Sequence, residues 1–292
     1  MHVHIGPEII PRRYCAARLA EELQPHNMGA VVKHHFIPTT YLVSGLPAPQ
    51  VLTGSVTLNT FCGGIQPDAL RSAAGGLRDH AAQEHPTPYR FVVWMPTISA
   101  RTHLAYYGRD LDTAWGVPIQ YAKSEAEATP LSVLNSDGQL TENTEALIQE
   151  IAASDLILAT GHLCRNEIFA LVERAVEIGV RRIVITHAFF PPHGLSIADQ
   201  VALSRLPGVY IEHSWFVSEI DGVSVSQYAE AIRAVGPAKT VLSTDGGQVV
   251  SDPIPQAWCK YISELQDEGI TLAEITRMAS ENPRQLLFGD AK

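Results

Sequence analysis

The stretch Leu156-Ile-Leu-Ala-Thr-Gly-His162 decides the fold, because its form recurs throughout the second half of the chain. A short apolar run ends in a polar residue, and a helical pattern follows before the next run begins. Three further runs of this form are Arg182–His187, Val209–His213 and Thr240–Asp245. Strands that alternate with helices pair in parallel, and their nearly continuous apolar character predicts burial on both faces.

The first half of the chain contains four more apolar runs that predict strands: His2–Ile5, Gly29–Phe36, Gly54–Thr60 and Arg90–Thr97. Eight strands with intervening helices in 292 residues predict an α/β fold, a single (β/α)8 TIM-like barrel domain over residues 1–292. An open doubly wound sheet is the alternative. It is disfavoured because no glycine-rich loop of the dinucleotide-binding or Walker type follows a strand.

Two segments depart from the regular alternation. Residues 98–140 form the least regular part of the sequence, and a connection of this length predicts an insertion or lid after the fourth strand. Within it, Asn135-Ser-Asp-Gly138 predicts a small hairpin. The helical patterns begin with a first helix at Pro11 and end with a last helix that stops near Asn282-Pro283.

Composition limits the classes of partner. The formal net charge is −10 and the acidic residues are spread along the chain, so no basic patch is available to bind nucleic acid. The four cysteines lie far apart without a Cys-x-x-Cys pair, which is typical of a reducing cytoplasm. No leader-like segment and no run of about 18 apolar residues is present. We therefore expect a cytoplasmic protein that acts on a small molecule and does not bind membranes. Barrels of this kind often form homo-oligomers, although no stretch of this sequence requires oligomerisation.

Polar residues gather at the carboxyl ends of the predicted strands, where a (β/α)8 barrel assembles its active site. His2 and His4 are two residues apart in one strand, so both face the same side. The other strand-end residues are Lys33, His34, His35, Asn59, Thr97, His162, His187, Glu212, His213 and Asp245. Several neutral imidazoles with a carboxylate form a donor set suited to Zn²⁺ or a similar ion such as Mn²⁺, with a position left open for water.

The joint pattern resembles the amidohydrolase superfamily of metal-dependent hydrolases. It comprises His-x-His on the first strand, a single histidine on the fifth and sixth strands, and an aspartate on the eighth. The ending Glu281-Asn-Pro-Arg-Gln-Leu-Leu287 is similar to the final helix of that family. Three short stretches of the sequence are similar to those of a small branch of amidohydrolase-like proteins: Val32–Phe36, Ala159–Leu163 and Ser243–Gln248.

The resemblance implies roles for individual residues. His2, His4 and Asp245 would be ligands of a first metal ion, and His162 and His187 would hold a second. Asp245 would also serve as the general base, because a carboxylate can touch the metal with one oxygen and the attacking water with the other. The site would thus contain one or two divalent ions.

One departure from the family pattern concerns the lysine. In many binuclear members a carboxylated lysine on the fourth strand bridges the metals, but that strand here ends Trp94-Met-Pro-Thr97. Lys33, on the second strand, is the strand-end lysine of this chain. It is a candidate bridging ligand and catalytic residue, a cationic group for an anionic substrate, or a structural lysine with an acidic partner.

Alternation along the strands predicts which side chains face the site. Lys33 and His35 are expected to point inward and His34 to pack against a helix, while either Glu212 or His213 faces the mouth. Candidate substrate-binding residues are His35, Asn59, Thr97, His103 and Glu212. Asn59 and Thr97 equally fit backbone capping, and His103 fits an ordinary position in the insertion.

Three functions remain open at this point. The first is a hydrolase that uses metal-bound hydroxide to cleave the C–N bond of an amide or cyclic amide, or a lactone, with Asp245 as base. The second is a metal-dependent decarboxylase or other lyase that acts on a small carboxylic acid. The third is a barrel that binds metal or ligand without catalysis.

Overall fold

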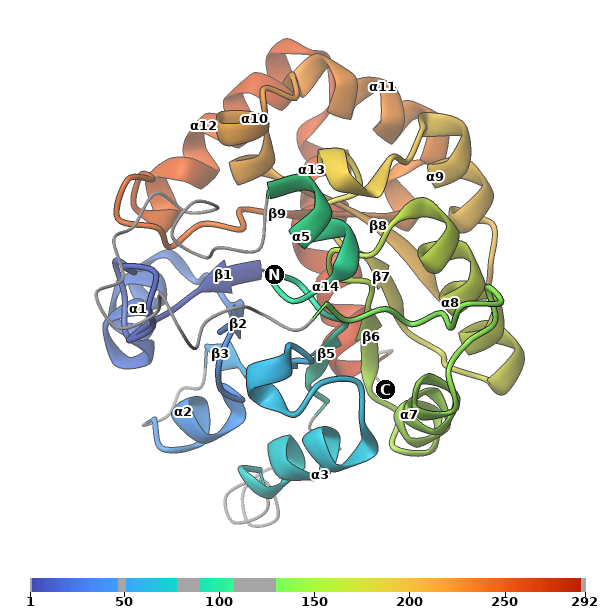
Figure 1. Ribbon diagram of the computed structural model, residues 1–292. Coiled ribbons are helices and arrows are strands. Elements are labelled where there is room, and N and C mark those ends of the chain that lie inside the picture. Colours follow the sequence, from blue (N-terminus) through green and yellow to red (C-terminus); the bar gives the residue numbers. More distant parts are fainter. Residues whose placement is uncertain (1, 47–50, 78–89, 108–129, 290–292) are drawn as a thin grey trace.

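The computed structural model describes residues 2–46, 51–77, 90–107 and 130–289. Strands occupy the middle of the molecule and helices surround them (Figure 1). All pairings between the strands of this part of the chain are parallel. The strands are β1 (His2–His4), β2 (Ala30–Lys33), β3 (Leu52–Thr53), β4 (Ser55–Thr57), β5 (Val92–Trp94), β6 (Ile157–Ala159), β7 (Ile183–Ile185), β8 (Val209–Ser214) and β9 (Thr240–Ser243).

The strands form two sheets. One has the order β1-β2-β3, and the other runs from β4 to β9 in chain order. Only Gly54 separates β3 from β4. The third predicted strand, Gly54–Thr60, corresponds to β4, and β3 is a short strand before it that was not predicted. A Cβ atom at Gly54 would lie 2.6 Å from the Cα atom of Thr40, which begins α2 (Thr40–Ser44). The chain therefore needs a glycine at this close approach.

The two sheets meet again where the first strand lies beside the end of the last. The His4 amide donates to the carbonyl of Gly246 at 2.8 Å, and the Asp245 amide donates to the carbonyl of His2 at 2.9 Å. Val3 and Gly246 form a parallel bridge. Gly247 follows with φ +116°, and a Cβ atom there would lie 2.1 Å from the His4 carbonyl oxygen. Both ends of the strand order are thus joined by backbone contacts.

The predicted α/β class with parallel strands and alternating helices is confirmed. Among the described residues, however, the hydrogen-bonded ladders form a three-stranded and a six-stranded sheet and not one continuous closed sheet. The predicted hairpin is present, because Leu134 and Leu140 form an antiparallel bridge and the Asn135 amide donates to the Gln139 carbonyl at 2.8 Å. Of the predicted lid, residues 108–129 lie outside the described part of the chain.

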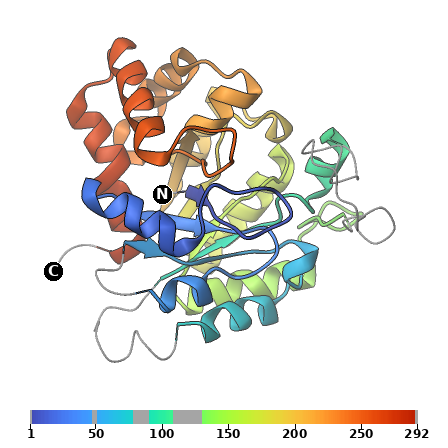
Figure 2. The ribbon, with the colours of Figure 1, turned by 90° about the vertical axis from the view of Figure 1, so that its left-hand side faces the viewer.

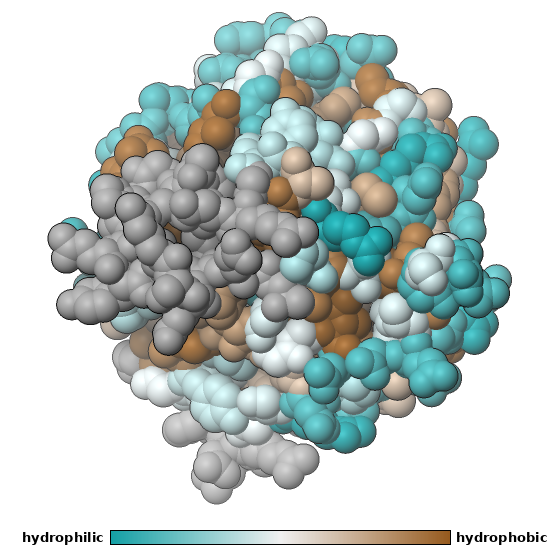
Figure 3. All heavy atoms as spheres, viewed as in Figure 1, coloured by the Kyte–Doolittle hydropathy of each residue, from teal (hydrophilic) through white to brown (hydrophobic). Residues whose placement is uncertain are grey.

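The helices cover the outer faces of the strands (Figures 1 and 2). Figure 3, which has the same view as Figure 1, shows hydrophilic residues along most of the described rim of the molecule. None of the described helices combines the length and apolar character needed to cross a bilayer. Besides α2, the main helices are α1 (Ala16–Leu23), α3 (Pro67–Gly75), α5 (Arg101–Tyr107), α7 (Glu142–Ala153), α8 (Arg165–Ile178), α9 (Ile197–Ser204), α10 (Trp215–Asp221), α11 (Val225–Val235), α12 (Ile254–Asp267), α13 (Leu272–Thr276) and α14 (Asn282–Phe288).

Two helix boundaries differ from the predictions. The first helix begins at Ala16 instead of Pro11, because the chain around Arg13 pairs with the loop after β9 through a 2.8 Å bond to the Gly247 carbonyl. The last helix does not stop near Asn282-Pro283. A π-helical turn over Arg277–Glu281 leads into α14, where proline stands at the start of a helix and needs no backbone donor.

A core fills the space between the inner faces of the strands. Buried side chains from five strands join a side chain of α14 in one cluster, which includes Val31, Val92, Ile157, Val184, Val241 and Leu286. Outside the strands, apolar faces of α3, α7, α8 and α9 pack on β4 to β8. A further cluster joins α1 and α12 to β1 and β2. The strands are thus buried on both faces, as their sequences predict.

An ion cluster ties the amino ends of three neighbouring strands. Asp155, just before β6, accepts hydrogen bonds from Arg90 Nε and Nη2 at 2.8 and 2.6 Å, and it also accepts one from Arg182. Arg90 precedes β5 and Arg182 precedes β7. Asp155 adopts φ +51°, a conformation that aspartate and asparagine tolerate better than most residues. The cluster fixes the spacing of these strands on the side away from the predicted site.

The Asp155→Asn variant tests this cluster. Partial burial would raise the pKa of Asp155, but its hydrogen bonds with Arg90 and the charge of Arg182 hold the pKa below 3.8. Because the folded state has the lower pKa, the stabilisation is complete above pH 3.8 and is lost as the pH falls through the folded value. Urea unfolding should show the variant less stable than the native chain at pH 7, with a difference that shrinks in acid. A difference that stays constant with pH would contradict this role.

The Gly54→Ala variant tests the close approach of α2. The added methyl group must displace backbone atoms of Thr40, so we expect a loss of about 1–3 kcal/mol in the free energy of unfolding. Gly45→Ala is the matched control, because a Cβ atom there meets nothing within 4 Å. Urea unfolding of both variants measures the difference, and equal stabilities would count against the packing argument.

Candidate metal centre

Three side chains from the first and last strands converge at the carboxyl ends. The Nε2 atoms of His2 and His4 lie 3.0 and 3.1 Å from the same oxygen, Oδ1 of Asp245. This oxygen nonetheless accepts no hydrogen bond of ordinary geometry from the described residues. The three ligand atoms lie within 4.8 Å of one another. Donor atoms that share one point without hydrogen bonds between them fit a divalent cation.

The protonation states in this group also favour a cation. Burial would raise the pKa of Asp245, but the adjacent His2 and His4 outweigh that effect and hold it well below its usual range. Burial, helped by the charge of Arg12, lowers the pKa of His4. An ionised carboxylate and a neutral imidazole are the forms that bind metals. Asp245 also adopts φ +50°, a strained conformation for a residue with a side chain, and such strain is common at functional sites.

Lys33 lies directly beside this group. Its Nζ atom is 3.1 Å from Nε2 of His2 and 4.5 Å from the centre of the Trp94 ring, on which His2 also stacks. The side chain is 1% exposed. Burial is the main reason that the pKa of Lys33 falls to about 8. Lys33 thus points inward, as alternation along β2 predicts.

Glu212 lies beside both His2 and His187. Its Oε1 atom lies 3.4 Å from Nδ1 of His2, and its Oε2 atom accepts a 2.9 Å hydrogen bond from the His187 amide. Burial opposes ionisation, but the nearby His2 and His187 lower the pKa of Glu212 to about 2. His213 points the other way and contacts the rings of Phe189 and Tyr228, which also contact each other. Glu212 is therefore the residue of this pair that faces the site, and substrate binding by it stays a prediction.

The histidines that follow β6 and β7, His162 and His187, form a second cluster. The ring centroids of His162 and His187 are 5.0 Å apart, and His187 lies 6.0 Å from His2. His103 on α5 reaches into this cluster, with its Nδ1 atom 2.9 Å from Nδ1 of His162. Neither His162 nor His187 belongs to a described three-residue group with ligand atoms within 4.8 Å of one another. The second metal ion at these two residues therefore stays a prediction.

A further three-residue group contains a side chain that the sequence reasoning missed. His4, Glu8 and His35 place their ligand atoms within 4.8 Å of one another. Glu8 lies in the loop after β1, and its Oε2 atom is 3.3 Å from Nδ1 of His35. Its other oxygen accepts a hydrogen bond from Arg12 Nε. Because the Arg12 guanidinium already supplies a cation to Glu8, this group is less suited to a metal than His2, His4 and Asp245.

The environment of Glu8 explains its ionisation. Burial would raise its pKa, but His35 and Arg12 together hold it far below the usual range. Burial lowers the pKa of His35 to about 4. The sequence signal for this cluster is only an acidic and a basic residue four positions apart in an irregular loop, and that pattern is too common to identify a site.

The remaining candidates have well-defined partners. The Asn59 amide donates to the His35 carbonyl at 3.1 Å and to Thr97 Oγ1 at 3.0 Å, and its Oδ1 atom accepts from the Thr97 amide at 2.8 Å. These bonds support a structural role, and substrate binding by Asn59 and Thr97 stays a prediction. The prediction that His34 packs against a helix is wrong. Its Nε2 atom lies 2.8 Å from the Pro7 carbonyl and its Nδ1 atom accepts from the Phe36 amide, because the chain turns sharply after β2.

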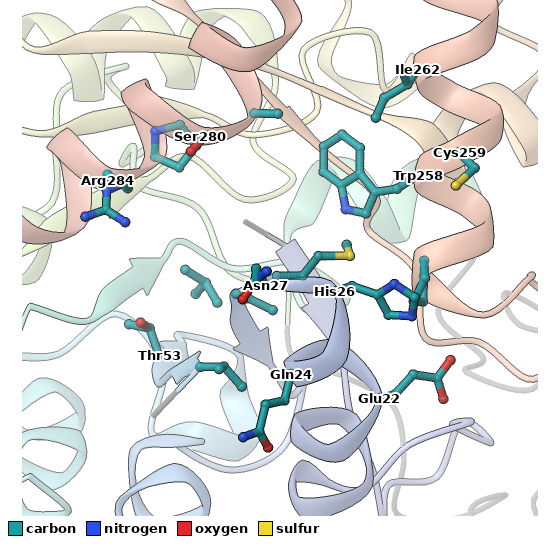
Figure 4. Close-up of a pocket in the computed structure, with 18 of the residues that line it drawn as sticks. Glu22, Gln24, His26, Asn27, Thr53, Trp258, Cys259, Ile262, Ser280 and Arg284 are labelled. Carbon is teal, nitrogen blue, oxygen red and sulfur yellow. The ribbon is translucent and has the colours of Figure 1, made fainter. Parts of the chain in front are cut away.

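A cavity of 1290 Å³ lies elsewhere, beside the amino end of β2 (Figure 4). Its walls come from the end of α1, from α12 and from α14, and they include Met28, Val51, Trp258, Ile262 and Leu287. None of the candidate ligands lines it. Since active sites of such folds lie at the carboxyl ends of the strands, this cavity is not part of the candidate metal centre.

Comparisons with known proteins give a family and a fold. A family model described as "Family of unknown function (DUF6282)" matches residues 1–212. A search of curated proteins finds no match. Among solved structures, an amidohydrolase from Burkholderia multivorans with bound HEPES is 14% identical, with a TM-score of 0.57 over 98% of this chain and 97% of that chain. A candidate 2-pyrone-4,6-dicarboxylic acid hydrolase from Pseudomonas putida is 15% identical, with a TM-score of 0.53 over 100% of this chain and 97% of that chain.

At these identities the structural likeness establishes the fold. It extends over nearly the whole of each chain, which confirms the predicted resemblance to the amidohydrolase superfamily at the level of architecture. The family model spans well over half of the sequence. The chain therefore belongs to the DUF6282 family and has the fold of the amidohydrolases.

Proposed function

We propose that this protein is a metal-dependent hydrolase that cleaves the C–N bond of an amide or cyclic amide, or a lactone, in a small molecule. The observation that carries the proposal is the convergence of His2 and His4 on one oxygen of Asp245. A protein of this fold is described as a candidate hydrolase of a 2-pyrone, which is a cyclic ester. That description supports the lactone within the proposed range of substrates.

The proposed site would hold a divalent ion, Zn²⁺ or Mn²⁺, through His2, His4 and Asp245. When bound, such an ion acidifies a water molecule and polarises a carbonyl group. Asp245 takes the proton of the attacking water on a carboxylate oxygen and then gives it to the leaving nitrogen or oxygen. The Glu212 carboxylate, 3.4 Å from Nδ1 of His2, places a negative charge beside that ring. Lys33, next to His2, places positive charge or a neutral amine at the edge of the site.

The proposal includes a closed barrel and a lid. The backbone bonds between β1 and the end of β9, with Gly54 as the other junction, support one ring of eight strands in a single domain. Helix α5 lies near the start of the proposed lid over residues 98–140. The hydroxyl of Tyr107 in this helix donates to Asp221 of α10 at 3.2 Å. This contact anchors the start of the lid beside the His103–His162 pair.

A metal-dependent decarboxylase remains the second candidate. The observation that favours it is that the carboxylate of one ligand group, Asp245, is not bound by an arginine, whereas Glu8 of the other group is bound by Arg12; this difference fits a single metal ion. Hydrolase and decarboxylase differ in product. A panel of amides, lactones and small unsaturated or aromatic acids, followed for acid release and for carbon dioxide, separates the two.

The Asp245→Asn variant tests the proposed base. Asparagine keeps the size of the side chain but cannot accept the proton, so turnover of any panel compound that the native protein hydrolyses should fall about 10²–10⁴-fold. Asp252→Asn, at an acidic residue paired with Lys260, is the matched control and should keep full turnover. Circular dichroism of both variants should match that of the native protein. A variant at position 245 with native turnover would remove Asp245 from the mechanism.

Metal content tests the proposed ligands without relying on turnover. We expect about one equivalent of zinc or manganese by inductively coupled plasma mass spectrometry, its loss in His4→Ala, and its retention in His26→Ala, which removes an exposed histidine of another loop. Lys33→Ala should leave this ion in place. Two equivalents that fall to one in Lys33→Ala would instead make Lys33 a bridging ligand, and no metal in the native protein would overturn the proposed centre.

A further inference from the structure

We propose that Arg12 forms a carboxylate-binding subsite beside the metal centre, so that the substrate of this protein carries a carboxylate group. This inference rests on the proposed function and narrows its substrate class. It concerns a residue that no expectation from the sequence included. Three features of the molecule support it: the partners of the guanidinium, its fixed position and the balance of charge around it.

The Arg12 guanidinium is buried and only partly satisfied. Its side chain is 1% exposed, and Nε donates to Glu8. Nη2 lies 3.4 Å from Nδ1 of His35. Nη1 is buried and has no hydrogen-bond partner among the described residues. Since buried donors of a charged group are rarely left unpaired, this nitrogen indicates a missing anionic or polar partner.

Arg12 is held next to the metal ligands. The ring of His35, which faces Nη2, lies 4.7 Å from the ring of His4. Arg12 pairs with Gln248 in an antiparallel bridge, so the loop after β1 is bound to the loop after β9. These two loops follow the strands that supply His4 and Asp245. A group bound at Nη1 would therefore lie close to a carbonyl at the metal centre.

The charge balance of the site favours an anion. Three buried carboxylates, Glu8, Glu212 and Asp245, face two buried cations, Arg12 and Lys33. A divalent ion at His2, His4 and Asp245 would make this site net positive, although the whole chain carries a formal charge of −10. A negatively charged substrate group would restore neutrality in a buried site, where an uncompensated charge is costly.

The free part of the guanidinium fits a carboxylate. Because Nε is used by Glu8, the donors that remain are those of Nη1, with a weak contact at Nη2. A planar carboxylate can accept from one edge of a guanidinium through its two oxygens. A phosphate dianion fits the same edge, but its second negative charge would leave the buried site net negative, whereas a carboxylate would make it neutral. We therefore assign the subsite to a single carboxylate on the substrate.

Isothermal titration with simple ligands tests the subsite. The probes are benzoate and acetate, with benzamide and acetamide as neutral matches, on protein as purified with its metal content measured. The carboxylates should bind at least tenfold more tightly than the amides. The Arg12→Gln variant should weaken benzoate binding about ten- to hundredfold, as expected for a hydrogen-bonded ion pair. The control is Arg13→Gln, since that guanidinium is occupied by the Val249 and Ser251 carbonyls and should leave benzoate binding unchanged.

Further variants keep the test decisive. Arg12→Gln leaves Glu8 without its cation, so the double variant Glu8→Gln with Arg12→Gln removes both charges and should fold, retain metal and fail to bind benzoate. Arg12→Lys keeps the charge but loses the two-donor edge, and its benzoate affinity should lie between those of the native protein and Arg12→Gln. Native benzoate affinity in the double variant would overturn the subsite, as would tighter binding of inorganic phosphate than of benzoate.

The outcomes separate this inference from the proposed function. Benzoate binding that depends on Arg12 in a protein with no hydrolytic activity would support the subsite and refute the hydrolase. Hydrolysis of neutral amides or lactones at undiminished rates in the Arg12→Gln variant, without any benzoate binding, would refute the subsite and leave the hydrolase intact.

Discussion

The contact between the first strand and the end of the last strand is the constraint on which the rest of the structure depends. It consists of two backbone hydrogen bonds, His4 to Gly246 and Asp245 to His2. The same few residues carry the side chains of the candidate centre. The junction therefore cannot shift by one residue without turning the ligands away from one another, because neighbouring residues of a strand point to opposite faces. The same residues therefore determine both how the first and last strands meet and where the candidate ligands lie.

The sequence around this junction serves that geometry. Gly247 allows the backbone after Asp245 to approach the His4 carbonyl more closely than any side chain would permit. Asp245 itself adopts a left-handed conformation, and His187 does so at the end of β7. Each such residue costs about 1–3 kcal/mol, which the well-packed strands beneath it offset. The strain is concentrated where the functional side chains are presented.

Burial explains the unusual electrostatics of the site. Charged groups in this region lie away from water, so each must have a partner of opposite charge or lose its charge. Glu8, Glu212 and Asp245 remain ionised because cations or imidazoles adjoin them, whereas His35 and His187 are held neutral, their pKa values lowered to about 4. The site therefore combines ionised carboxylates with neutral imidazoles, and burial together with close pairing maintains this combination.

Periodic features were predictable from the sequence, and features that depend on loops were not. All eight expected strands are present, and His2, His4 and Asp245 meet because strand ends share one side of a parallel sheet. Strand β3 was missed, and so was the close approach of α2 to Gly54, which no local pattern reports. Glu8 and Arg12 were missed for a similar reason: they lie in an irregular loop whose path is set by the chain after β9. The orientation of His34 depended on the same kind of turn.

The distance along the chain between His2 and Asp245 has a consequence for how the protein matures. The candidate ligands His2 and His4 are synthesised before Asp245, and the strands from β2 to β9 lie between them in the sequence. If these residues form the proposed centre, the growing chain would offer a metal ion only two histidines, and tight binding would require the docking of the last strand. Such an ion would bind only the folded chain, in which the first strand lies beside the end of the last, and it would therefore stabilise the completed fold and slow its opening.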